Sequence, residues 1–285
     1  MSRALIIAGF ALRESVRKRV FIVVALLTVA FLGLYALGVW QISQEIDEIG
    51  GVDGVEGDVV AGATLLGLSM FAILFLGAIL AVFLTLGAVR GDAERGLLQP
   101  LIVRPLTRGT FLLGRYIAAA SVCAAYVIVV FLAAVVITNI FIGWWPDQLV
   151  VPALQLGAGV AVIAALALGG SVVLSSTANG IAVFMLFGAG LVAGLLGQIA
   201  EPEALNSDTL ETVSRAASWV LPFEALYQSA LSAVTADTVG FARFAINLGP
   251  FGGATSFGPV LVPFTVAYVA GIGAAALWAF KRRDL

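Results

Sequence analysis

Histidine is absent from the 285 residues of this chain, and cysteine occurs once, at position 123. A single cysteine cannot form a disulfide within the chain, and without histidine a metal site built from imidazole or thiolate ligands is not expected. Cys123 lies in the middle of an apolar segment, where we interpret it as a small buried hydrophobe. We therefore expect this chain to hold neither a metal nor a cofactor.

Motifs for nucleotide binding and catalysis are missing as well. The phosphate-binding loop G-x-x-x-x-G-K-[ST] does not occur, because both lysines, Lys18 and Lys281, are followed by arginine. An enzyme working within the membrane would need paired acids, histidines or a cysteine site at membrane depth, and the apolar segments contain none of these. We expect no enzymatic activity from this chain.

Charged residues make up only 11% of the chain, and the centres of its apolar segments carry none. A carrier driven by protons or sodium would be expected to hold such a group, because charges kept inside a membrane usually mark an ion pathway. The energy for any transport should therefore come from outside the membrane. Uncharged segments also suit an apolar or lipid-like substrate better than an ion.

Six long apolar segments dominate what is present. Each meets the length of about 20 residues that a helix needs to cross a bilayer. They lie near residues 20–40, 59–89, 117–142, 150–174, 180–200 and 260–280. Their long unbroken runs lack the alternation of outer-membrane strands. The sequence predicts an all-α polytopic membrane protein, with residues 1–285 forming a single transmembrane domain.

The basic residues fall almost entirely on one side of these segments. If the N-terminus is cytoplasmic, then all of them except Arg215 and Arg243 lie in the cytoplasm, as the positive-inside rule requires. The acids gather on the other side, in the loop after the first segment and in residues 201–259. This arrangement predicts that both termini lie in the cytoplasm. We expect the protein itself to lie in the plasma (inner) membrane of a prokaryote. It also argues against nucleic acid as a partner.

The cytoplasmic loop between the second and third segments, residues 90–115, has the most specific pattern. Asp92 and Glu94 suit the start of a helix, where the helix dipole favours negative charge. Leu97, Leu98, Leu101 and Ile102 then form one apolar face. Pro105 ends this element, and Thr107 is placed to cap the next helix. The pattern alone equally fits an interfacial helix that merely ends a loop.

This loop resembles the signature of ABC-2 type transporter permeases. The run GDAERGLLQPLIVRPLTRGTFLLGRY carries the acid-Arg-Gly, the leucines, the Arg-Pro, the Thr-Arg and the Leu-Gly-Arg of that signature. Gln99 and Pro100 depart from it. The basic N-terminal segment, the six spans, the large outer segment before the last span and the basic C-terminus agree with the same family.

The resemblance implies that the loop is a coupling helix, which docks on a separate ABC ATPase subunit that binds ATP and Mg. Two permease copies, as a homodimer, and two ATPases would make the working unit. Residues 1–19 would form an interfacial helix beside membrane lipid. The residues expected to meet the ATPase or to shape the turn are Asp92, Glu94, Arg95, Gly96, Leu97, Leu98, Arg104, Pro105 and Arg108.

Residues 201–259 form the one sizeable extracytoplasmic segment. Asn206 or Ser207 is placed to cap a first helix, which carries Leu210, Val213, Ala217 and Val220 on one side. Pro222 should break that helix and open a second one. The apolar stripe of the second helix comprises Phe223, Leu226, Tyr227, Ala230, Leu231 and Val234. We expect this segment to lie against the outer ends of the spans.

Two classes of function remain open at this point. The chain is either the membrane subunit of an ATP-driven exporter, with a path between two copies, or a scaffold that relays ATPase motion to an outer partner. Both would use the 90–115 loop.

Overall fold

The structure is a computed structural model, and it describes residues 19–49, 57–85, 107–199, 208–234 and 254–282. All of the long elements in these residues are helices. They are α2 (Arg19–Ile49), α3 (Gly57–Thr85), α6 (Arg108–Ile142), α7 (Val150–Val173), α8 (Ser176–Ile199), α9 (Asp208–Val220), α10 (Pro222–Val234) and α12 (Leu261–Lys281). The predicted interfacial helix falls almost wholly outside the described residues, as do residues 201–207 and 235–253 of the outer segment.

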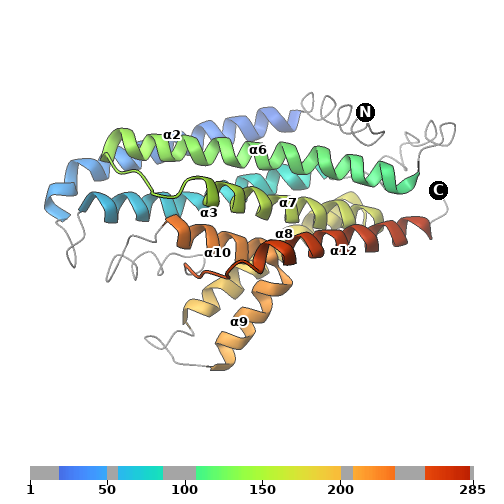
Figure 1. Cartoon of the computed structure of the whole chain (residues 1–285). Coiled ribbons are helices and arrows are strands. Elements are labelled where there is room, and N and C mark those ends of the chain that lie inside the picture. The colour runs from blue at the N-terminus through green and yellow to red at the C-terminus, as the bar shows by residue number, and fades with distance from the viewer. Residues whose placement is uncertain (1–18, 50–56, 86–106, 200–207, 235–253, 283–285) are drawn as a thin grey trace.

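Six of these helices are long and apolar enough to cross a membrane, which confirms the predicted spans. They are α2, α3, α6, α7, α8 and α12. In Figure 1 they lie lengthwise beside one another, with α3 and α7 inside the bundle and α2 and α12 at its edges. Burial agrees, since two thirds of the apolar stretch considered in α3 and in α7 is buried, but only about a tenth of that in α2 and in α12.

Close contact at small residues brings the inner helices together. Gly77 of α3 lies against Val127 of α6 and Val160 of α7, and a methyl group added to it would come within 2.7 Å of the Val160 side chain. Small residues of this kind let membrane helices approach closely. Paired hydroxyls join α2 to α6, where Thr28 lies 2.5 Å from Tyr126 and Tyr35 lies 2.6 Å from Thr138.

The outer segment contains the two predicted helices, with the break at the predicted proline. α9 ends at Val220 and α10 begins at Pro222. The predicted apolar stripe of α10 is fully buried. On α9, however, Val213 and Val220 are exposed, and among the side chains described there Ser214 and Ser218 are buried. α9 packs with its serine face against α8 because Gly197 leaves room for the Ser214 side chain.

α10 packs along the sides of the spans and not only against their ends, which differs from the expectation. It packs along α7 and also contacts α3, α8 and α12. Phe223, in its first turn, stacks on Phe187 near the middle of α8, with ring centres 5.7 Å apart. Gln155 of α7 donates a hydrogen bond of 2.8 Å to the Ser229 hydroxyl of α10. In Figure 1, α10 lies alongside the bundle while α9 projects away from it.

Candidate functional site

Most of the predicted coupling residues lie outside the described part of the chain. These are Asp92, Glu94, Arg95, Gly96, Leu97, Leu98, Arg104 and Pro105. Their roles therefore stay predictions. The described residues begin again at Thr107, so the structure shows how the chain that leaves this loop joins the helix bundle.

Thr107 caps α6, as the sequence predicts. Its backbone is extended, with φ −72° and ψ 144°, and its side-chain oxygen accepts a hydrogen bond of 3.2 Å from the Thr110 amide. A hydroxyl at this position satisfies one of the amide groups that have no partner in the first turn of a helix. α6 therefore begins sharply at Arg108, immediately after the loop.

Arg108 connects the start of α6 to the end of α12. Its guanidinium donates a hydrogen bond of 2.5 Å to the Phe280 carbonyl and one of 3.4 Å to the Lys281 carbonyl. The same group lies 5.3 Å from the centre of the Phe280 ring. Carbonyls in the last turn of a helix lack partners within it, and a cation there is also favoured by the helix dipole. Arg108 thus caps α12 from a neighbouring helix.

A small apolar cluster supports this connection. It is made by residues of α6, α7 and α12 at the same end of the bundle. They are Phe111, Leu112, Leu168, Val172, Ala276 and Phe280. Because Phe280 is only 3% exposed, the carbonyl that Arg108 binds is held in a packed position. We call this end the basic end, since Arg108, Lys281 and Arg282 lie there.

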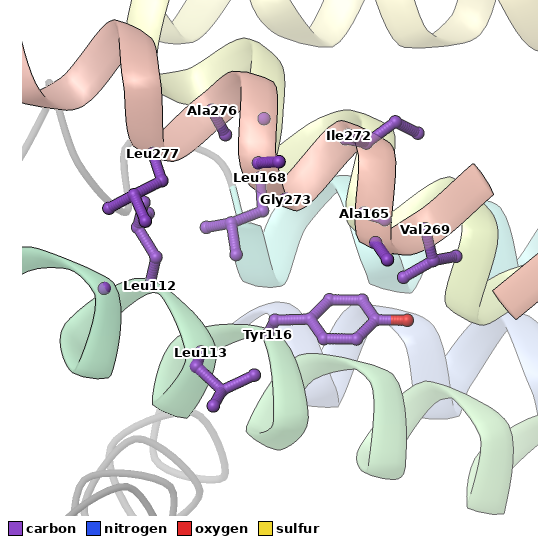
Figure 2. Close-up of a pocket in the computed structure, with 14 residues that line it drawn as sticks. Leu112, Leu113, Tyr116, Ala165, Leu168, Val269, Ile272, Gly273, Ala276 and Leu277 are labelled. Carbon is purple, nitrogen blue, oxygen red and sulfur yellow. The ribbon is translucent and has the colours of Figure 1, made fainter. Parts of the chain in front are cut away.

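A groove opens beside the cluster, between α6, α7 and α12. Its volume is about 310 Å³, and its lining side chains are apolar except for Tyr116. In Figure 2 the Tyr116 ring lies along the groove below Ala165 and Val269, while Leu112 and Leu277 approach each other at its other end. The Tyr116 hydroxyl donates to the Ala161 carbonyl at 3.4 Å. The groove is therefore shaped for a hydrocarbon group.

The structure also shows a buried carboxyl that sequence reasoning missed. Glu224 is one of the acids in residues 201–259, which we expected on the outer side, yet it is fully buried in α10, beside Gly194 of α8. One of its oxygens accepts a hydrogen bond of 3.3 Å from Gln228, and the other has no partner. α10 is not one of the six spans, and burial raises the pKa of Glu224 to about 8, while the Gln228 bond opposes that shift.

A signal for this burial was present in the sequence. Glu224 is the one acid in the apolar stretch Pro222–Val234, and it directly follows Phe223. An acid in the first turn of a helix is also favoured by the helix dipole, so its position alone does not distinguish a buried carboxyl from an exposed one. The groove had no comparable signal, because α12, which forms one of its walls, lies far from α6 and α7 in the sequence.

The described residues offer no place for a metal ion, since no three acidic or cysteine side chains come together there. The Cys123 side chain is fully buried in the core, as interpreted from the sequence.

Comparison with known proteins places these features in context. A family model described as "ABC-2 family transporter protein" matches residues 5–285. A search of curated proteins finds no match.

Proposed function

The chain belongs to the ABC-2 family of transporter proteins, and from that premise we propose that it is the permease subunit of an ATP-driven exporter. Membership of this family and the six membrane helices make it a transmembrane permease. The proposal adds that two copies form the transport unit. It adds also that each copy takes its energy from a separate ABC ATPase through residues 90–115.

The observation that carries the proposal is the match of the family model along nearly the whole chain, residues 5–285. It includes the loop whose acid-Arg-Gly and Arg-Pro pattern resembles the coupling signature. Because the chain contains no phosphate-binding loop, the ATP and Mg that drive transport bind to the partner.

The geometry at Arg108 suggests how motion of the loop reaches the spans. A displacement of the segment before Thr107 would move the first turn of α6. The Arg108 hydrogen bonds would transmit that movement to the last turn of α12. α6 and α12 each pack on α7, which lies inside the bundle. Displacement of the loop would thus move several helices together, which is what alternating access requires.

The test is to express the chain together with an ABC ATPase from a neighbouring gene of the same genome and to purify the complex. We expect two copies of each subunit by native mass spectrometry, and vanadate-sensitive ATP hydrolysis by the complex only. Hydrolysis by the isolated chain, or failure of the two proteins to associate, would contradict the proposal. A structure of the complex with a continuous path lined by both copies supports export, whereas a closed interface supports a force-transmitting scaffold.

A further inference from the structure

The groove is walled by three of the membrane-spanning helices, α6, α7 and α12, and extends toward the C-terminal end of α12. Its α12 wall includes Val269, Gly273 and Leu277, which follow one another at intervals of four residues. Residues at this spacing share one face of a helix, so the groove runs along about 12 Å of α12. Its volume of about 310 Å³ is roughly twice that of an apolar cavity known to admit benzene.

Two basic residues, Lys281 and Arg282, lie at the end of α12 that the groove approaches. Lys281 is the next residue on the same helical face, four positions after Leu277. Lys281 and Arg282 are both exposed. The Arg282 guanidinium lies 3.9 Å from the ring centre of Trp278, whose side chain is 58% exposed. Exposed tryptophan beside basic residues is typical of the membrane–water interface.

We propose that this groove binds one anionic phospholipid, with an acyl chain between the helices and the phosphate beside Lys281 and Arg282. The apolar wall matches the acyl chain of such a lipid, and the two cations match its phosphate. In a bilayer the phosphate lies at the surface and the acyl chain lies below it, which is the order found along α12. Glycine at position 273 makes the room, because nothing lies within 4 Å of where its side chain would begin. The site does not depend on the ATPase or on the coupling loop.

α12 offers a matched pair of substitutions for the test. Gly271 and Gly273 both have open space beside them, but only Gly273 lines the groove. Gly273→Leu therefore fills the groove, while Gly271→Leu adds the same side chain elsewhere on the same helix. A third variant, Lys281→Ala with Arg282→Ala, removes both cations and leaves the apolar wall intact. Melting temperatures in detergent establish that each variant folds as the wild type does.

The full chain is reconstituted in vesicles of equal parts dioleoylphosphatidylglycerol and dioleoylphosphatidylcholine, then released and examined by native mass spectrometry. We expect one phosphatidylglycerol per chain in the wild type and in Gly271→Leu, and loss of it in Gly273→Leu. The preference over phosphatidylcholine should be about 30-fold, since each basic residue near an anionic headgroup contributes about a factor of five. The double alanine variant should lose that preference.

Two outcomes would overturn the proposal. Equal lipid retention by Gly273→Leu and Gly271→Leu would place the lipid elsewhere, and equal retention of the two lipids by the wild type would exclude recognition of an anionic headgroup. A change from dimer to monomer in Gly273→Leu, with lipid retention unchanged, would instead assign the groove to a second copy of the chain.

Discussion

Replacing Arg108 with alanine should loosen the connection between α6 and α12. The variant loses the 2.5 Å hydrogen bond to the Phe280 carbonyl and the contact with the Phe280 ring. A hydrogen bond from a charged donor contributes about 1.5–3 kcal/mol and a cation–π contact about 0.5–1 kcal/mol. Because the guanidinium is only partly buried, water replaces some of this. We expect a loss of about 1–2 kcal/mol.

The assay is thermal unfolding of the purified chain in detergent. At roughly 2–4 °C for each kcal/mol in a protein of this size, Arg108→Ala should lower the melting temperature by roughly 2–8 °C. Arg108→Lys keeps the charge but not the planar, multi-donor group, so its loss should be intermediate. In the control Lys281→Ala, an exposed charge is removed while the backbone carbonyls that Arg108 binds remain, and the loss should be smaller.

The reasoning would be refuted if Arg108→Ala unfolded at the wild-type temperature. It would also be refuted if Lys281→Ala cost as much as Arg108→Ala, because the effect would then come from net charge at the basic end and not from capping of α12.

Three further predictions concern packing, protonation and topology. Gly77→Ala should lower the free energy of unfolding by about 1–3 kcal/mol because the methyl group overlaps two valines, whereas Gly33→Ala, in open space, should be nearly neutral in the same melting assay. For Glu224 the native state keeps its proton up to about pH 8, while the unfolded chain releases it near 4.5. Wild-type stability should therefore fall as pH rises from about 4.5 to 8. Thermal melts recorded across this pH range should show that Glu224→Gln removes the dependence of stability on pH. An unchanged dependence in the variant would contradict the burial of this carboxyl. Asp147 is exposed, so a cysteine placed there should react with an impermeant thiol reagent added outside intact cells. The native Cys123 is buried and should not react. Reaction of the wild type at Cys123 would be inconsistent with the core described above.

The sequence was sufficient to predict the features that depend on local pattern. The six spans follow from apolar length, and the start of α6 follows from Thr107, whose hydroxyl occupies the expected capping position. Pro222 separates α9 from α10 as predicted, because proline fits the first turn of a helix but not its interior.

Features that depend on contacts between distant residues could not be predicted in this way. The burial of Glu224 results from the insertion of α10 beside α8, and the Arg108 contact joins residues 172 positions apart. The orientation of α9 was also not fixed by its pattern, because its serine side packs on α8 where Gly197 leaves room for the Ser214 side chain, a contact that the pattern of neither helix predicts.

The central claim is that residues 90–115 couple this permease to its ATPase, and the affinity between the two proteins tests it most directly. The purified ATPase is titrated onto the chain in lipid nanodiscs, with Glu94→Ala, Arg95→Ala and the exposed control Asp147→Ala. Truncating a charge that is desolvated at an interface costs about 2–5 kcal/mol, so we expect Kd to rise by about 30-fold or more for the first two variants and to stay unchanged for the control. A rise below about fivefold for both, as for exposed loop charges, would contradict the account.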